Sequence, residues 1–155
     1  MTTTSKPQEP PIIDLSSTGV SVLSPLPPND TDIVIAGDDL YLRLHLAITG
    51  IPLITGMWAS EKVEITHHVE EIHTGARKTL GPFAFTTPAP AGLANFEFTT
   101  GPFTTSVNGG GGTFETAAGD DDGVYRVVTE FHFTKNNAVK ADSVFNDRIL
   151  AITKG

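Results

Sequence analysis

Residues 119–133 read GDDDGVYRVVTEFHF, a polar turn that leads into a regularly alternating segment. One face of that segment takes Tyr125, Val127, Thr129, Phe131 and Phe133, and the other takes Arg126, Val128, Glu130 and His132. Alternation with a period of two is typical of a β-strand that has one face in a core and the other in water. The stretch therefore predicts a half-buried strand against which the rest of the chain must pack.

The start of this strand, Asp121-x-Gly123-x-Tyr125, resembles the turn and strand F of immunoglobulin-like (Ig-like) β-sandwiches. The resemblance implies that Tyr125 is the corner tyrosine, whose hydroxyl folds back onto the preceding turn, and that Gly123 is the tight-turn residue. The antibody-type cysteine would fall at Val127, and the chain has no Cys. The resemblance is therefore to the broad Ig-like architecture and not to antibody domains.

Two further segments alternate in the same way. Residues 40–48 place leucines and Ile48 on one face and predict strand B. Residues 63–69 place Val63, Ile65, His67 and Val69 inward and predict strand C. Ile72 is out of phase with that set, which predicts a bulge near Glu70–Glu71.

Shorter segments complete the expected fold. Residues 12–15, 19–23 and 33–35 are predicted edge strands, residues 113–117 are predicted strand E, and residues 145–153 are the predicted last strand. Residues 79–105 carry short Phe-bearing strands that Gly-Pro turns are expected to separate, and residues 135–143 read as a polar hairpin connection. The sum is an all-β, Ig-like antiparallel β-sandwich of about eight strands. Residues 12–155 form its single domain, and residues 1–11 form an extended N-terminal arm.

Composition limits the partners to be expected. The formal net charge is −8, and the 10 Lys and Arg are scattered, so no basic face is available for nucleic acid or an anionic membrane surface. Neither a transmembrane span nor a standard signal peptide is visible, which predicts a cytoplasmic protein or one exported without a classical signal. Without Cys there is no disulfide or thiolate chemistry.

Acidic turns precede two of the predicted strands. Strands B and F begin at the same pole of an Ig-like sandwich, so five carboxylates could converge there and bind calcium. The alternative is that Asp and Gly are simply turn residues, since no calcium-loop spacing is present. The carboxylates concerned are Asp38, Asp39, Asp120, Asp121 and Asp122.

Histidines offer a second metal hypothesis. His68 on strand C and His132 on strand F point outward on neighbouring strands, and Glu70 and Glu130 share those faces. Two imidazoles and a carboxylate could hold zinc or copper. The alternative is an ordinary cross-strand polar pair.

No G-x-S-x-G, Walker or H-E-x-x-H motif occurs in the sequence, so we expect neither an enzyme nor a bound cofactor. The favoured function is a self-associating structural subunit of a filament, sheath or other assembly. An extended arm with Pro10, Pro11, Ile12, Ile13 and Leu15 could add to a sheet edge of a neighbouring copy. The alternative is a binding module that uses its loops, with or without calcium, for a glycan or protein partner.

Overall fold

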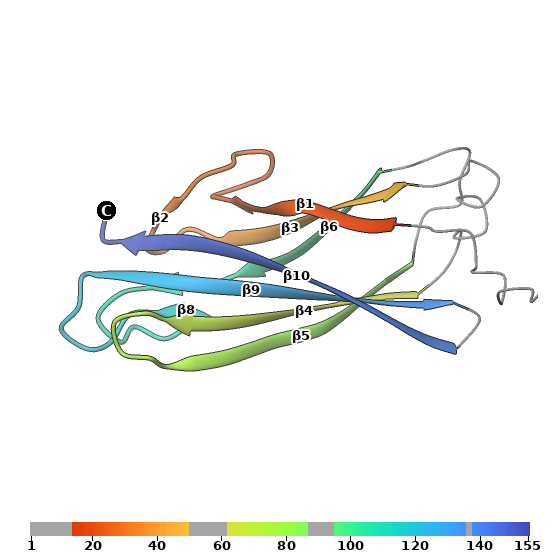
Figure 1. Cartoon of the computed structure of the whole chain (residues 1–155). Helices are drawn as coiled ribbons and strands as arrows, with labels where there is room; N and C mark the ends of the chain where they lie inside the picture. The colour runs from red at the N-terminus through yellow and green to blue at the C-terminus, as the bar shows by residue number, and fades with distance from the viewer. Residues whose placement is uncertain (1–13, 50–61, 87–94, 136–137) are drawn as a thin grey trace, which may run out of the picture.

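The computed structural model of this chain describes residues 14–49, 62–86, 95–135 and 138–155. In these residues two β-sheets face each other, and a short pair of strands accompanies them (Figure 1). The described strands are β1 (Asp14–Leu23), β2 (Ile33–Ile35), β3 (Leu40–Thr49), β4 (Lys62–Glu71), β5 (Arg77–Thr86), β6 (Asn95–Phe103), β7 (Thr105–Ser106), β8 (Phe114–Glu115), β9 (Asp122–Lys135) and β10 (Ala138–Thr153). No helix of the described chain is long and apolar enough to cross a membrane.

The strand order is that of an Ig-like sandwich. One sheet has the order β1-β3-β6 and the other has the order β2-β10-β9-β4-β5. In Ig-like lettering these are strands A, B and E against A′, G, F, C and C′. Pairing within both sheets is antiparallel except for β2, which runs parallel to β10. The predicted architecture, an Ig-like antiparallel sandwich with eight strands in its two main sheets, is confirmed.

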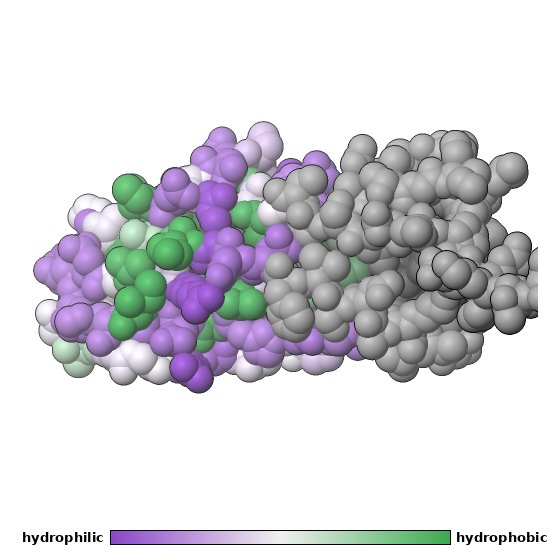
Figure 2. Space-filling view, in the orientation of Figure 1, coloured by the Kyte–Doolittle hydropathy of each residue, from purple (hydrophilic) through white to green (hydrophobic). Residues whose placement is uncertain are grey.

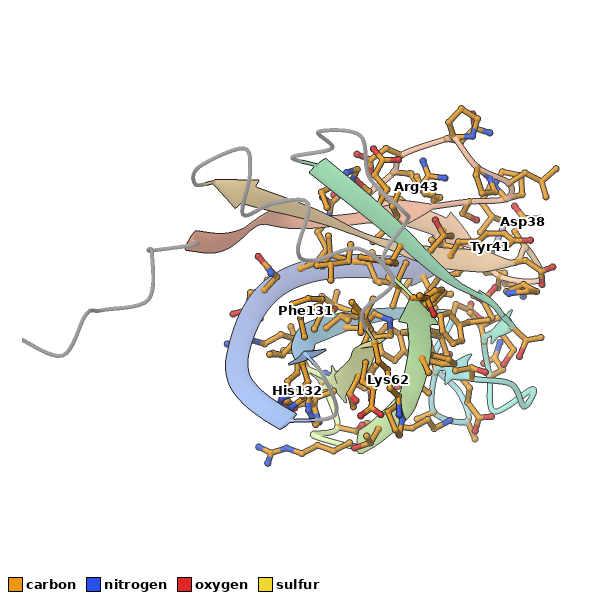
Figure 3. The ribbon with its side chains drawn as sticks, turned by 90° about the vertical axis from the view of Figure 1, so that its right-hand side faces the viewer. Asp38, Tyr41, Arg43, Lys62, Phe131 and His132 are labelled. Atoms are coloured by element: carbon orange, nitrogen blue, oxygen red, sulfur yellow. The ribbon has the colours of Figure 1, made fainter. Side chains whose placement is uncertain are left out.

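The core lies between the sheets, where the sequence placed it. Strands β3, β4 and β9 supply side chains from alternate positions, and Phe131 lies inside the sandwich while the next residue, His132, points outward (Figure 3). Fully burying one such apolar side chain contributes roughly 1.5–3 kcal/mol, so these three strands carry much of the driving force for folding. Their buried members include Leu40, Leu42, Leu44, Val63, Ile65, Val69, Tyr125, Val127 and Phe131.

His67 is also buried, as predicted, and both ring nitrogens have partners. The Thr100 hydroxyl donates to the Leu42 carbonyl, so it accepts a hydrogen bond from His67 Nε2 at 2.7 Å. The Thr129 hydroxyl then donates to His67 Nδ1 at 2.8 Å. Burial, with a smaller effect of His68, lowers the pKa of His67 to about 4. His67 is therefore a neutral imidazole with its proton on Nε2, and it links the two sheets.

The prediction of turns at the Gly-Pro pairs is wrong. Gly81-Pro82 lies within β5 and Gly101-Pro102 lies within β6, and each adds one residue relative to the partner strand, which makes a β-bulge. The glycines have φ of 105° and 119°, and a Cβ on Gly81 would lie 2.8 Å from the Ile65 carbonyl oxygen. After each bulge a phenylalanine packs inward, and the rings of Phe83 and Phe103 lie 5.9 Å apart.

Two other predicted features of the middle of the chain are also wrong. Residues 113–117 were predicted to form strand E, but the strand that lies beside β3 in that position is β6. Of residues 113–117 only Phe114–Glu115 form a strand, which pairs with β7. A positive φ at Gly119 turns the chain soon after this short pair. The bulge near Glu70–Glu71 is absent, since β4 pairs with β9 in continuous register through Glu71. Ile72 is out of phase with the inward set because it faces outward, just past the end of the strand, with 50% of its surface exposed.

Strand limits differ at both ends of the chain. The segments predicted as two edge strands, 12–15 and 19–23, belong from Asp14 onward to one strand, β1, with a register irregularity between Ser17 and Gly19. The predicted polar connection at 135–143 is mostly strand, and Lys135 pairs with Ala138. Polar residues pair here because backbone hydrogen bonds sustain a hairpin, so side-chain polarity is a poor guide to where it ends.

Candidate functional site

The predicted corner tyrosine lies at the start of β9. The Tyr125 side chain is buried, and its hydroxyl donates a hydrogen bond to the backbone carbonyl of Glu115. Burial, together with the nearby carboxylates of Glu71 and Glu115, raises the pKa of Tyr125 to about 12. The hydroxyl therefore stays protonated and ties β9 to β8.

Gly123 has a different role from the one expected. It lies within β9 without a positive φ, and the positive φ belongs to Gly119 in the preceding turn. A Cβ at position 123 would lie 2.6 Å from Thr116 Cγ2. The glycine is therefore required by close packing rather than by turn geometry. Asp121, the third residue of the predicted motif, accepts a hydrogen bond from Asn108 Nδ2 at 2.7 Å.

The acidic turns are not gathered into one site. The Asp38 and Asp39 carbonyls accept hydrogen bonds from the Thr105 and Ser24 hydroxyls, which anchors that turn by its backbone. The Asp120 carbonyl accepts a hydrogen bond from Thr116 Oγ1 in a separate turn. Asp122 begins β9, on the second of these turns. Within the described parts of the chain, no three His, Asp or Glu side chains are grouped to hold a metal ion.

The outward histidines meet at one carboxylate. His68 Nε2 lies 3.0 Å from Glu130 Oε2, and His132 Nε2 contacts Glu130 Oε1. The hydrogen bond from His68 is the main cause that lowers the pKa of Glu130, with a further contribution from His132. Glu70 does not join them and instead pairs with Arg77 at 3.2 Å. The three side chains form a cross-strand polar cluster.

Most of the predicted assembly arm lies outside the described residues. Pro10, Pro11, Ile12 and Ile13 belong to that part, so their role stays a prediction. Leu15 is described as part of β1, where it pairs with Ile48 of the same chain.

A row of apolar side chains crosses the outer face of the five-stranded sheet, and the sequence reasoning missed it. Ile33 lies opposite Ala151 and Ala151 lies opposite Val124, while the Ile72 N–H donates to the Val124 carbonyl at 2.8 Å. Figure 2 shows these hydrophobic residues as a band across β2, β10 and β9. We call this surface the apolar row, and it comprises Ile33, Ile35, Ile72, Val124, Ile149 and Ala151.

Exposure distinguishes the apolar row from the rest of the sheet. Ile33 and Ile149 keep 58% and 57% of their surface exposed. Val124 and Ile149 lie on the outward phase, next to the buried Tyr125 and Leu150. The sequence did contain a signal for this surface, because these are β-branched residues at positions that the alternation assigns to solvent. Isolated exposed apolar residues are ordinary, but here five exposed residues and the half-buried Ala151 lie on neighbouring strands as one apolar patch.

Charges of both signs border the apolar row. Arg126, which lies opposite Ile149, makes a two-pronged ion pair with Asp147 at 2.9 Å and 2.7 Å. The hydrogen bond from Arg126 lowers the pKa of Asp147. At the other border Lys154 Nζ lies 3.9 Å from Asp121 Oδ1. Each border thus offers a positive and a negative group side by side.

Comparison with known proteins adds a fold neighbour but no family. No protein-family model matches the sequence, and no curated protein matches it. Among solved structures, the chain is similar to the CARDB domain of the PF1109 protein from Pyrococcus furiosus, described as in complex with di-metal ions. The two share 13% sequence identity over 92% of this chain and 96% of that one, with a TM-score of 0.43.

Proposed function

We propose that this chain is a non-catalytic structural subunit that associates with itself, and that a second copy docks on the apolar row. The observation that carries the proposal is the continuity of that row across four neighbouring strand positions, from Ile33 through Ala151 and Val124 to Ile72. Burying apolar surface of this kind on association is favourable by about 25 cal/mol per Å². A filament, sheath or similar assembly is the setting in which such a subunit would work.

A second copy suits this surface better than a partner of opposite charge. The borders carry Arg126 beside Asp147 and Lys154 beside Asp121, so a two-fold contact can place each positive group against a negative group of the other copy. A strongly basic partner would instead find both borders already neutralised. The surrounding net charge of −8 opposes association at long range, so we expect added salt to strengthen it.

The face is also large enough for a specific contact. Strands β4, β5, β9 and β10 are each ten residues or longer. With about 4.8 Å between strands and about 3.3 Å per residue, four strands of ten residues cover a flat area of roughly 600 Å², to which protruding side chains add. A specific interface should bury at least about 1,000 Å² in total, which is about 500 Å² from each partner. The apolar row gives that face a hydrophobic centre, which is where binding energy concentrates in protein interfaces.

A two-fold contact alone gives a dimer, and a larger assembly needs a second surface. The N-terminal arm supplies one in this proposal, by adding Ile12 and Ile13 to a sheet edge of the next copy. In the described residues, β2 and β5 are the two edges of the five-stranded sheet. Strand β2 has 3 residues, and the Gly81-Pro82 bulge in β5 interrupts a straight edge.

Sedimentation velocity over a range of protein concentrations tests the proposal. We expect the wild-type sedimentation coefficient to rise with concentration, and Ile149→Glu to keep the chain monomeric, since it places like charges against each other. Leu26→Glu is the matched control, because Leu26 is 60% exposed but lies between β1 and β2, outside the apolar row. A wild-type chain that stays monomeric at millimolar concentration, or equal effects of the two variants, would contradict the proposal.

A further inference from the structure

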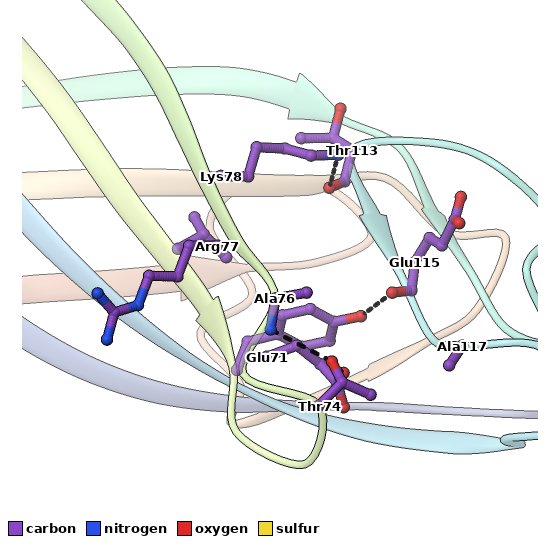
Figure 4. Close-up of a pocket in the computed structure, with 10 residues that line it drawn as sticks. Glu71, Thr74, Ala76, Arg77, Lys78, Thr113, Glu115 and Ala117 are labelled. Atoms are coloured by element: carbon purple, nitrogen blue, oxygen red, sulfur yellow. Dashed lines mark hydrogen bonds between the residues drawn. The ribbon is translucent and has the colours of Figure 1, made fainter.

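A cavity of about 410 Å³ opens between the β4–β5 turn and β8, and no residue of the apolar row lines it (Figure 4). Its walls include Thr74, Lys78, Glu115 and Ala117, and its floor is made of inward-facing residues at the end of β4 and the start of β9. Cavities that bind small molecules usually measure about 300–1,000 Å³. The space is therefore adequate for a small ligand or for one side chain of a partner.

The floor of this cavity contains a buried carboxylate. Glu71 occupies an inward-facing position of β4, where Val63, Ile65 and Val69 are apolar, and only 5% of its surface is exposed. The Thr74 hydroxyl donates a hydrogen bond to Glu71 Oε2. Among the described residues no cation pairs with Glu71, and Oε1 receives no hydrogen bond. Glu71 therefore keeps one carboxylate oxygen open for a ligand, and a ligand that donates hydrogen bonds and carries a positive charge complements it best.

The cations at the rim are already engaged elsewhere. Lys78 Nζ donates to the Thr113 carbonyl at 3.0 Å, and Arg77 pairs with Glu70. Glu115, a second carboxylate, also lines the cavity. Lys78 keeps its positive charge, because its partners are neutral carbonyls, but it is held at the rim; the floor presents the Glu71 carboxylate and one aromatic ring, that of Tyr125, to whatever enters the cavity.

We propose that this cavity binds a primary ammonium group on an aliphatic chain, with Glu71 as its counter-ion. An ammonium is compact and can donate to the open Oε1 while it lies against the ring of Tyr125, a favourable arrangement for a cation. A guanidinium would use both carboxylate oxygens, and Thr74 occupies one of them. A metal ion would need several ligands, and the described residues group no three His, Asp or Glu side chains for one. The cavity is separate from the apolar row, so this proposal does not depend on self-association.

Titration of the ¹⁵N-labelled protein, followed by two-dimensional NMR, tests the proposal. The probes are n-pentylamine, N-acetyl-lysine-N-methylamide and the neutral analogue 1-pentanol. We expect saturable shifts of the Glu71, Thr74 and Tyr125 amide signals with both amines, and at least tenfold weaker binding of 1-pentanol. Tighter binding of pentylamine identifies a free small amine as the ligand, and tighter binding of the lysine derivative identifies a lysine side chain of a protein.

Two variants make the result specific to the cavity. Glu71→Gln keeps an acceptor for Thr74 but removes the charge. Ala117→Leu fills the cavity while keeping Glu71, and it tests the site if Glu71→Gln folds poorly. Each should weaken amine binding at least tenfold, whereas Asp122→Asn, which removes a surface carboxylate outside the cavity, should not. Equal binding to Glu71→Gln, or unsaturated shifts spread over the acidic surface, would overturn the proposal.

Discussion

The buried His67 should make the stability of the fold depend on pH. Its pKa is lowered from 6.5 to about 4 by burial between the sheets, and the unfolded chain restores the ordinary value. Between these two values the unfolded state binds more protons than the folded state, so stability falls as the pH falls. The stabilisation is fully present above pH 6.5 and is lost progressively as the pH approaches 4.

The size of the effect follows from the shift. At 1.36 kcal/mol per pKa unit, a pKa lowered from 6.5 to about 4 corresponds to about 3 kcal/mol over the whole window. Between pH 7.5 and pH 5.5 the same linkage gives a loss of about 1.3 kcal/mol. That interval stays above the isoelectric point near 4.9, where the chain would be least soluble. The lowered pKa values of Glu130 and Asp147 leave both carboxylates ionised throughout it.

Urea unfolding at pH 7.5 and pH 5.5 measures this loss in the wild type and in His67→Gln. The variant cannot titrate at position 67, so its free energy of unfolding should change with pH by about 1.3 kcal/mol less than that of the wild type. His73→Gln is the control, because it removes an exposed histidine from the turn after β4 and leaves His67 and its neighbour His68 in place, so the loss caused by His67 should remain. If wild type and His67→Gln lose equal stability, the reasoning about the buried neutral imidazole is refuted.

Three further changes test other contacts. Tyr125→Phe removes the hydrogen bond to the Glu115 carbonyl and should lower the free energy of unfolding by about 1–1.5 kcal/mol, so an unchanged urea midpoint would argue against the corner. Gly81→Ala forces a Cβ to within 2.8 Å of the Ile65 carbonyl at a φ of 105° and should cost about 1–3 kcal/mol, measured by thermal unfolding against Ala84→Ser in the same strand. Deletion of residues 1–13, which removes Ile12 and Ile13 but leaves β1 intact, should weaken assembly beyond the dimer without changing the unfolding midpoint, as sedimentation and urea titration would report; a lower midpoint would assign the arm to the fold of its own chain.

Alternation predicted the architecture well where a strand has one apolar and one polar face. Strands β3, β4 and β9 have this pattern, and their buried positions were foreseen, including the polar His67. The Gly-Pro pairs were misread because a bulge and a turn use the same residues, and only the register of the partner strand separates them. The long β9–β10 hairpin was missed because backbone pairing continues beyond the alternating apolar residues.

The candidate surfaces were harder to foresee than the core. The apolar row depends on four strand segments that are far apart in the sequence, so no local pattern brings Ile33, Val124 and Ile149 together. Glu71 was assigned to a predicted bulge near Glu70–Glu71, yet the strand continues through it and places it inward, on the floor of the cavity. In both cases the phase of a residue in its strand, and then the order of the strands, decides its surroundings.

Cysteine cross-linking tests the central claim, self-association through the apolar row, most directly. The chain has no Cys, so single-cysteine variants at Val124, Ile149 and Leu26 each present one reactive thiol. Treatment with a short bismaleimide cross-linker, followed by denaturing electrophoresis, reports which positions meet in the assembled protein. We predict covalent dimers from the variants at Val124 and Ile149 and none from Leu26; equal yields from all three positions, or dimers from Leu26 alone, would contradict the claim.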